Sequence, residues 1–509
     1  MMKKLALLLA LLFVFMMWPV GTVSAAAGSE LTLSVRAGDV FLTRELTDGN
    51  CETKWTAAND LSLSVVSEMG NISGLYLVFD TPVKYSVNIG NKIYSGGQNG
   101  FIHEYVPVSE SNPNVRHVYI NLPKGATICD IYAFSGKTMP DWVQTWEPPC
   151  EKADLLLVSS HADDEQLFFA GVLPYYTQVK NYAVQVAYMT DHNGEIKRHH
   201  ERLDGLWKAG VRHYPISSGY ADIYSDSVGE ALQNLASYDI DERTIVEYQK
   251  SVIARFQPQV IVTHDVNGEY GHGMHRLTAK TVCQAVDEAK VSFPFLKKVY
   301  LHSYDNGSTT LDFLDTAFAE LGGKTPFEVS QSAFLCHKSQ LGTWFKGWLF
   351  GSDGSNTSAA TIQKYSPMKY GLYYMATGVS DAKKNDLMEG ITCYEELDRI
   401  AKEEADRIAK TTSVEATVVG SDLNFLSTFS IIFGVVFILA VAGMVYYVLS
   451  KPGRKKRRHR HHHHHHHHHH EHSSDSGEKT KKTESTDSDK KPNRHHDDSP
   501  SDSGKETDK

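Results

Sequence analysis

LLLVSSHADDE, residues 155–165, runs from four consecutive apolar residues into an imidazole and three carboxylates. A short, continuous apolar run is typical of a strand that is buried on both faces of a parallel sheet. Similar runs at residues 183–189 and 260–263 also lead directly into polar residues. The segments 198–209 and 245–256 between them have the apolar spacing of helices. This alternation predicts the α/β class, with a Rossmann-like open parallel sheet.

The polar residues that follow these runs are expected to meet. In open α/β sheets, ligands bind beyond the carboxyl ends of the strands. The first run leads into His161 and two adjacent aspartates, the second into Asp191 and the third into His264, with GHGMH at residues 271–275 shortly afterwards. The sequence therefore predicts one site that is built from three strand ends.

These residue types suit a metal ion that is used for hydrolysis. A catalytic zinc ion has about three protein ligands and an open position for water, and imidazole and carboxylate both serve as ligands. His161, Asp164 and His275 supply such a set, Asp163 offers a base beside it, and His272 is left to face the substrate. We therefore predict Zn2+ as the cofactor, although these ligands also admit other divalent ions.

Two further residues are expected to support the site without binding the metal. We expect Glu165 to hold the loop through hydrogen bonds. His264 either orients a metal ligand or is an ordinary polar residue at a strand end, and the sequence leaves both interpretations open.

Three separated stretches resemble one known family. HADDE at residues 161–165 resembles the HPDDE signature of the PIG-L/LmbE-type deacetylases, and THDVNGEYGHGMH at 263–275 resembles their second signature. RHHE at 198–201, followed by AGV at 209–211, is similar to a helix of the same family. The resemblance covers residues 150–390 with the motifs in the family's order. It implies a Rossmann-like fold and the zinc-dependent removal of acetyl groups from N-acetylglucosamine units.

The resemblance also implies roles for single residues. It makes His161, Asp164 and His275 the zinc ligands, Asp163 the general base, protonated His272 the group that stabilises the oxyanion, and Arg198 a substrate-binding residue. We further expect Asp191, in a strand-end loop, to contact sugar hydroxyls. The sequence departs from the family at Ala162, where the family has proline, and at residues 273–274, where Gly-Met replaces Pro-Asp. We expect both changes to loosen loops without removing a ligand.

Residues 28–148 have a different pattern. Alternating apolar and polar residues, as at 61–65 and 117–122, recur without a long helical period and predict a β-sandwich that precedes the deacetylase-like domain at 149–393. LTDGNCETKW at 46–55 resembles a stretch of discoidin-like, galactose-binding-type domains. A plain turn followed by a core tryptophan is the alternative explanation of that stretch.

The two ends of the chain predict a single-pass membrane protein. Residues 1–27 have the charged, apolar and small-residue regions of a signal peptide. Residues 425–449 carry no charge and are long enough for a transmembrane helix, and the basic residues that follow predict a cytoplasmic tail. Residues 394–424 are expected to form a helical stalk or a helix packed on the α/β domain. Residues 450–509, which include ten consecutive histidines, are expected to be disordered.

Composition excludes some function classes. The net charge is −10 and no domain-wide basic face is evident, so we expect no nucleic-acid partner. Six cysteines in 509 residues are too few for a dense disulfide framework. The sequence thus predicts an extracellular, membrane-anchored, zinc-dependent hydrolase acting on an N-acetylated surface or wall glycan or a glycolipid. The alternatives are an amidase for another N-acyl substrate and a catalytically silent protein that binds surface glycans.

Overall fold

The computed structural model describes residues 28–304, 307–418, 435, 438 and 439. The chain divides into two compact units, Met1–Glu415 and Ala416–Lys509, and the features below lie in the first, except for the last three residues of α12. No helix among the described residues is long and apolar enough to cross a membrane. The predicted signal peptide (1–27), the predicted tail (450–509) and all but three residues of the predicted membrane segment (425–449) lie outside the described residues.

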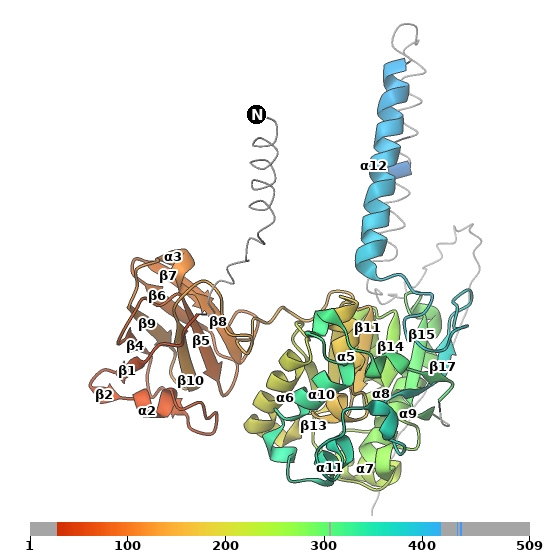
Figure 1. The fold of residues 1–509 in the computed structure, drawn as a ribbon, viewed down its shortest axis with the longest axis horizontal. Coiled ribbons are helices and arrows are strands. Elements are labelled where there is room, and N and C mark those ends of the chain that lie inside the picture. The colour runs from red at the N-terminus through yellow and green to blue at the C-terminus, as the bar shows by residue number, and fades with distance from the viewer. Residues whose placement is uncertain (1–27, 305–306, 419–434, 436–437, 440–509) are drawn as a thin grey trace, which may run out of the picture. The chain divides into compact units, whose positions relative to one another are not determined.

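The N-terminal part is a sandwich of two antiparallel sheets (Figure 1). One sheet has the order β2-β1-β4-β9-β6-β7, with bounds Val40–Phe41, Leu33–Ala37, Leu61–Ser67, His117–Leu122, Tyr85–Ile89 and Lys92–Gly96. The other is β3-β10-β5-β8, with bounds Trp55–Thr56, Thr127–Phe134, Gly74–Phe79 and His103–Pro107. Short helices α2 (Thr43–Leu46) and α3 (Val108–Ser111) complete this part. Val35 and Leu63 of one sheet share a core with Leu75 and Leu77 of the other, which accounts for the alternating pattern.

The discoidin-like stretch forms a turn that is hydrogen-bonded to β10. Gly49 has φ 71°, and its N–H donates to Asp130 Oδ1 at 3.1 Å. The Asn50 N–H donates to Asp48 Oδ1 at 2.9 Å. These contacts explain the Asp-Gly pair as a turn, and the discoidin-like resemblance stays a prediction.

A seven-stranded sheet follows, in the order β13-β12-β11-β14-β15-β17-β16. Its strands are β11 (Leu155–Ser159), β12 (Val184–Thr190), β13 (Ile216–Tyr220), β14 (Val260–Thr263), β15 (Lys298–His302), β16 (Thr309–Thr310) and β17 (Lys369–Met375). The first five strands in this order are parallel, but β17 pairs antiparallel with β15, and β16 pairs antiparallel with β17. The predicted open parallel sheet therefore carries two antiparallel strands at this edge. Because an antiparallel neighbour starts where the previous strand ends, the segment 303–368 between β15 and β17, which includes the short strand β16, starts and ends at the carboxyl edge of the parallel strands.

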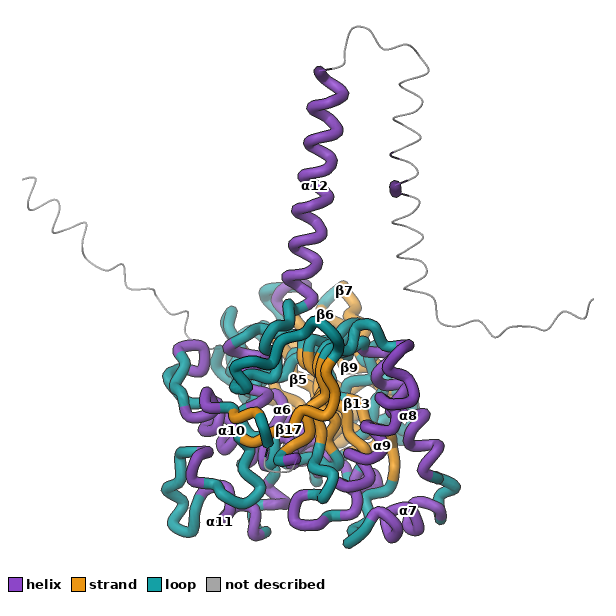
Figure 2. The backbone as a smooth tube through the Cα atoms, turned by 90° about the vertical axis from the view of Figure 1, so that its right-hand side faces the viewer, coloured by secondary structure: helices purple, strands orange, loops and turns teal. Residues whose placement is uncertain are grey.

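Helices cover both faces of this sheet (Figures 1 and 2). Leu155 and Leu157 of β11 lie in one core with α6 (Ile196–Lys208) and α10 (Pro326–Phe334), whereas Leu156 and Val158 lie in another with α8 (Glu242–Phe256) and α9 (Gly273–Ala289). Burial on both sides explains the unbroken apolar run of β11. The other helices are α4 (Asp164–Leu167), α5 (Val172–Pro174), η1 (Tyr175–Val179), η2 (His192–Gly194), α7 (Val228–Ala236), η3 (Glu269–Gly271), η4 (Lys290–Ser292), η6 (Asp312–Asp315), η7 (Ala319–Leu321), η8 (Lys338–Gln340), α11 (Trp344–Phe350), η9 (Ala359–Thr361) and α12 (Tyr394–Val418).

Helix α12 occupies part of the predicted stalk, and its first residue is hydrogen-bonded to the α/β domain. The Tyr394 N–H donates to Asp154 Oδ1 at 2.7 Å, and the Tyr394 hydroxyl donates to the Gln257 carbonyl at 2.7 Å. All six cysteines are free thiols in the structure.

The sandwich contacts the α/β domain through a buried chain of hydrogen bonds. The Tyr76 hydroxyl lies 2.6 Å from His103 Nδ1, and His103 Nε2 lies 2.7 Å from Nδ1 of His200 on α6. His200 is buried on this side of α6, with only 3% of the residue exposed. The sandwich covers this face of α6, which the helix sequence alone does not reveal.

Both histidines of this contact should make the fold sensitive to acid. Burial lowers the pKa of His103 well below its ordinary value and, with His199, lowers the pKa of His200 to about 4. The unfolded chain takes up these protons below pH of about 6.5, so stability should fall between about pH 6.5 and pH 4, by on the order of 3 kcal/mol for His200. Thermal unfolding across this range should show a smaller loss for His200→Gln than for wild type. The exposed variant His117→Gln serves as control, and equal losses in all three proteins would contradict the prediction.

Candidate metal centre

Three predicted ligand atoms converge at the carboxyl ends of β11 and β14. His161 Nδ1 lies 3.1 Å from Asp164 Oδ2 and 3.2 Å from His275 Nε2, and those last two atoms are 3.3 Å apart. Ligand atoms at about 2.0–2.1 Å from a tetrahedral zinc ion lie roughly 3.3–3.4 Å from one another. The triangle therefore has the dimensions of a zinc ligand set, and all three residues are buried.

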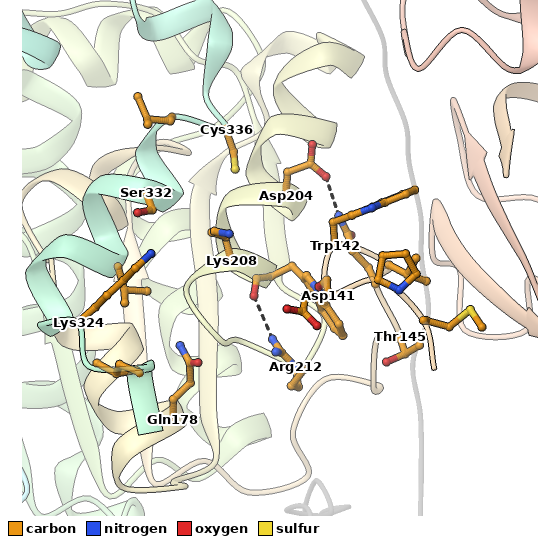
Figure 3. A pocket seen from close by; sticks show the side chains of 18 of the residues that line it. Asp141, Trp142, Thr145, Gln178, Asp204, Lys208, Arg212, Lys324, Ser332 and Cys336 are labelled. Carbon is orange, nitrogen blue, oxygen red and sulfur yellow. Dashed lines mark hydrogen bonds between the residues drawn. The ribbon is translucent and has the colours of Figure 1, made fainter. Parts of the chain in front are cut away.

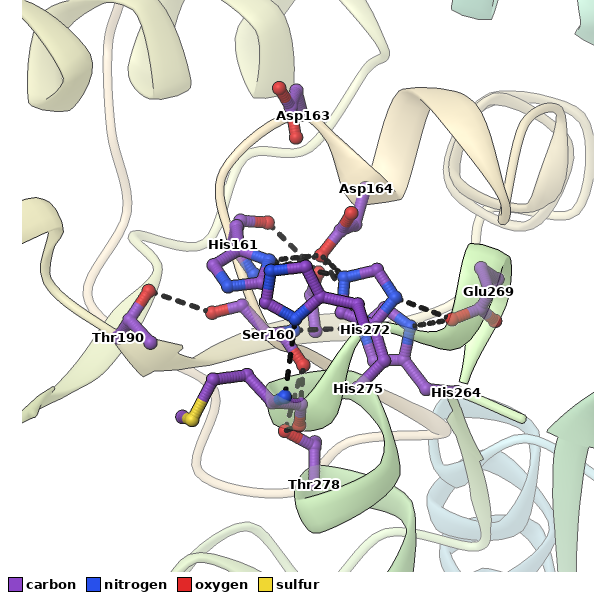
Figure 4. A network of polar contacts seen from close by, with 12 residues as sticks. Ser160, His161, Asp163, Asp164, Thr190, His264, Glu269, His272, His275 and Thr278 are labelled. Carbon is purple, nitrogen blue, oxygen red and sulfur yellow. Dashed lines mark hydrogen bonds and ion pairs between the residues drawn. The ribbon is translucent and has the colours of Figure 1, made fainter. Parts of the chain in front are cut away.

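Glu269 fixes the orientation of His275, the third predicted ligand (Figure 4). Its Oε2 accepts hydrogen bonds from His275 Nδ1 at 2.7 Å and from His264 Nδ1 at 2.8 Å, and its Oε1 accepts one from His302 Nδ1 at 2.6 Å. Because Nδ1 of His275 carries the hydrogen, its Nε2 presents a lone pair to His161 and Asp164. A carboxylate behind a metal-binding histidine is the usual way of holding such a ring. Lone pairs that face one another at this distance fit a cation between them.

Without a metal, a proton stabilises this cluster. Burial alone would lower the pKa of His275, but Asp164 and Glu269 outweigh it and raise the pKa to about 10. Burial likewise opposes ionisation of Asp164, yet His275 and His161 hold its pKa well below the usual range. The site thus attracts positive charge strongly.

His264 is also close to the cluster, with its Nε2 3.5 Å from Asp164 Oδ2. Two further groups among the described residues could hold a metal: His161, His272 and His275, and Asp164, His264 and His275. However, His264 Nε2 accepts the N–H of Ser160 at 2.9 Å, and its Nδ1 donates to Glu269. Both ring nitrogens are therefore already used. This favours His264 as an orienting residue, which is one of the two roles that the sequence left open.

Asp163 stands at the beginning of α4 with φ 116° and ψ −30°. Its N–H donates to Glu165 Oε2 at 2.9 Å, so the buried Glu165 holds the loop. Arg198 lies against the same loop, with Nη2 donating to the Ala162 carbonyl and lying 3.5 Å from Asp163 Oδ2. Burial, opposed by Arg198, raises the pKa of Asp163 to about 6.

His272 caps α9 and is not the imidazolium that the resemblance implies. Burial, with His161 and His275 adding to it, lowers the pKa of His272 to about 2. Its Nδ1 accepts the Met274 N–H at 3.1 Å. The hydrogen of the neutral ring therefore sits on Nε2, which can still donate a hydrogen bond.

A cavity of about 250 Å3 opens onto part of this cluster. Its lining includes His161, Asp163, Asp164 and His272, together with Arg198 of α6. The other lining residues come from later loops and from the segment at 303–368: His192, Asn193, Glu195, Asp222, Tyr224, Tyr270, Gln340 and Phe345. A cavity of this size is smaller than the range of about 300–1,000 Å3 for pockets that bury drug-sized ligands.

Asp191 is placed differently from its prediction as a sugar-binding residue. It lies outside the cavity, and its Oδ1 is 3.1 Å from His199 Nε2 and 3.7 Å from Arg202 Nη1. The carboxylate is therefore used to hold the start of α6 against the end of β12. The strand-end loop supplies its neighbour His192 to the cavity instead.

The comparisons with known proteins bear on this part of the chain. Residues 156–286, which include all three predicted ligands, match the family model described as "PIG-L: GlcNAc-PI de-N-acetylase". These residues form a PIG-L family domain.

A curated relative of the PIG-L domain is the 1D-myo-inositol 2-acetamido-2-deoxy-alpha-D-glucopyranoside deacetylase of Acidothermus cellulolyticus. It is 29% identical over 157 residues, which cover 27% of this chain and 54% of the relative. The chain thus spans about half the length of the curated relative that it matches.

Similar solved structures include an N,N'-diacetylchitobiose deacetylase from Pyrococcus horikoshii (15% identity, TM-score 0.32, 44% of this chain and 88% of that chain). Another is the zinc-inhibited form of teicoplanin deacetylase Orf2 (15% identity, TM-score 0.30, 44% of this chain and 99% of that chain). A pectin-binding carbohydrate-binding module covers 22% of this chain and 96% of its own, with 14% identity and a TM-score of 0.15. These likenesses are too low to assign a function.

The PIG-L domain also contains two residues that contact the predicted site and to which sequence reasoning gave no role. Asp222 Oδ1 lies 3.4 Å from His161 Nε2, and Asp222 Oδ2 accepts from His192 Nδ1 at 2.8 Å. His192 Nε2 in turn accepts the Ala162 N–H at 2.9 Å. Asp222 and His192 therefore hold both His161 and the residue that follows it. Glu269 was inside a quoted motif but received no role, and no sequence signal pointed to Asp222.

The hydrogen bond at Ala162 uses an N–H that the family's proline lacks. His192→Leu removes its acceptor, and we expect the metal affinity to fall about tenfold or more. Adding Ala162→Pro removes the unsatisfied N–H and fixes the local φ, so the double variant should recover most of the affinity. Competition with a chromogenic chelator measures this without any substrate, and Ala162→Pro alone is the control. A double variant that binds no better than His192→Leu would contradict this role of His192.

Proposed function

We propose that this protein is a zinc-dependent deacetylase that hydrolyses the acetamide of an N-acetylglucosamine-containing glycan or glycolipid. The observation that carries the proposal is the triangle of His161 Nδ1, Asp164 Oδ2 and His275 Nε2 beside a cavity that also exposes Asp163 and His272. The curated relative with the matching domain is named as a deacetylase of a 2-acetamido-2-deoxy-glucopyranoside. A 2-acetamido sugar is therefore the substrate class that we infer for this chain.

His161, Asp164 and His275 would hold the metal. A divalent ion bound there would supply Lewis acidity for the acetamide carbonyl and make a water molecule more acidic. The protein's own contribution is to keep the two rings and the carboxylate in place through Glu269 and Asp222.

Asp163 is the group that we assign to proton transfer. Its carboxylate lines the cavity next to the ligand Asp164, and it takes the proton of the attacking water and delivers it to the leaving amine. Arg198, 3.5 Å from Asp163 Oδ2, positions this carboxylate. Whether Arg198 also contacts the sugar stays a prediction from the resemblance.

Neutral His272 stabilises the oxyanion as a hydrogen-bond donor. Its Nε2 is the hydrogen-bearing nitrogen because Nδ1 accepts the Met274 N–H. A positioned neutral donor stabilises developing negative charge in a site that excludes water. The products are acetate and a free amino sugar.

We also propose that the domain acts outside the cell and is anchored by one helix. The support is in the sequence: the signal-like residues 1–27, the uncharged segment 425–449 and the basic residues that follow it. A surface or wall glycan, or a lipid-linked saccharide, would then be the accessible substrate. Protease accessibility of the α/β domain on intact cells tests this location, and protection of the domain until the membrane is opened would contradict it.

Acetate release from N-acetylglucosamine oligomers tests the activity. The full-length protein should release acetate, a chelator should abolish the release, and added Zn2+ should restore it. Release from another N-acyl compound alone would instead favour a related amidase. Oligomer binding without release, with metal bound, would favour a silent glycan-binding protein.

A further inference from the structure

A second cavity, called the large cavity below, lies outside the catalytic one, between the loop at residues 139–145 and helices α6 and α10 (Figure 3). Its volume is about 920 Å3, compared with about 250 Å3 for the catalytic cavity. The loop at 139–145 precedes residues 156–286, which match the PIG-L family model. This cavity is therefore built partly from a segment that the family match does not include.

The lining of the large cavity favours a neutral, hydroxyl-rich ligand. Four basic and three acidic residues line it, so their charges nearly cancel. Trp142 is 45% exposed, and edge contacts with Tyr76 and Tyr132 at 5.6 and 5.0 Å between ring centroids hold its indole in place. Gln178 and Lys324 add an amide and an amine that can bond to oxygens. An aromatic surface beside mixed donors and acceptors matches a sugar ring, which has an apolar C–H face and a rim of hydroxyls.

Helix η8 borders both cavities. In η8, Lys338 lines the large cavity and Gln340 lines the catalytic one. Ser339 between them accepts a hydrogen bond from Arg198 Nη1 at 3.2 Å, and its N–H donates to Glu201 Oε1 at 2.8 Å. The exposed Ser339 is therefore held against α6 between one residue of each cavity, where a chain of sugars can pass over it.

We propose that the large cavity binds further sugar units of an oligosaccharide whose reacting N-acetylglucosamine unit occupies the catalytic cavity. This inference rests on the proposed function and makes its substrate a chain of sugars rather than a single sugar. The volumes of about 250 and 920 Å3 leave much more room for sugar units in the large cavity than in the catalytic one. Binding energy from those remote units would then increase kcat/KM.

Oligomers of one to six N-acetylglucosamine units test this proposal with the full-length protein. We expect kcat/KM for the hexamer to exceed that for the monomer by about tenfold or more. Trp142→Ala and Lys324→Ala should each lower this ratio several-fold. Lys324 is exposed, so its variant keeps the test valid if Trp142→Ala disturbs the aromatic contacts. Lys290→Ala, exposed at the end of α9, is the matched control and should retain the wild-type ratio.

Calorimetric binding of the hexamer to chelator-treated protein separates this proposal from the proposed activity. We expect binding that Lys324→Ala weakens and Lys290→Ala does not. If no oligomer released acetate while this binding pattern held, the deacetylase proposal would fail and the cavity assignment would stand. If acetate were released with equal kcat/KM from monomer and hexamer, the cavity assignment would be overturned and the deacetylase proposal would stand.

Discussion

Replacing Asp163 with asparagine is expected to lower acetate release by about 10²–10⁴-fold, which is the usual contribution of a positioned general base. The amide keeps the size of the side chain but cannot take a proton from water. The metal should remain bound, because Asp163 does not belong to the triangle of ligand atoms. Turnover by a discontinuous acetate assay, with zinc content measured on the same sample, distinguishes loss of the base from loss of the metal.

Asp191→Asn is the matched control for that experiment. Asp191 is an aspartate at the same sheet edge, but its carboxylate pairs with His199 and Arg202 outside the cavity. Its variant should retain activity within a few-fold. Full turnover in metal-loaded Asp163→Asn would show that another group accepts the proton.

Glu269→Gln is expected to reduce metal affinity by about 10–100-fold. Glu269 accepts hydrogen bonds from three buried histidines through two oxygens. Glutamine offers one oxygen, and its NH2 would face a ring nitrogen that now donates. His275 would then lose its fixed tautomer and stop presenting Nε2 reliably to the metal.

Chelator competition on purified Glu269→Gln measures this effect without substrate. Glu247→Gln, on the exposed surface of α8, is the control for a change of charge alone. Wild-type affinity in Glu269→Gln would mean that the surrounding packing is enough to orient His275.

The sequence predicted the elements whose signal is local. Strands β11 and β14 lie where their apolar runs do, because strands buried on both faces need no alternation. The candidate ligands could be predicted from the sequence for a related reason. His161 and Asp164 directly follow a strand, and parallel strands bring their carboxyl ends together.

The parts that were missed depend on contacts between distant segments. His302 bonds to Glu269, which is 33 residues away in the sequence. The Ala162 N–H donates to His192, which is 30 residues away in the sequence. A single buried polar residue on a strand or loop has no periodicity that marks it. The neutral state of His272 also follows from burial, which residue spacing does not reveal.

The backbone at Asp163 makes stability and activity compete. A non-glycine residue at φ 116° is strained, at a cost of order 1–3 kcal/mol, and this one also buries a carboxylate. Asp163→Gly should relieve the strain, remove the buried acid and raise the melting temperature while destroying turnover. Selecting variants of this protein for heat resistance alone would therefore favour loss of the residue on which its chemistry depends, so an engineering programme has to screen for acetate release from the first round.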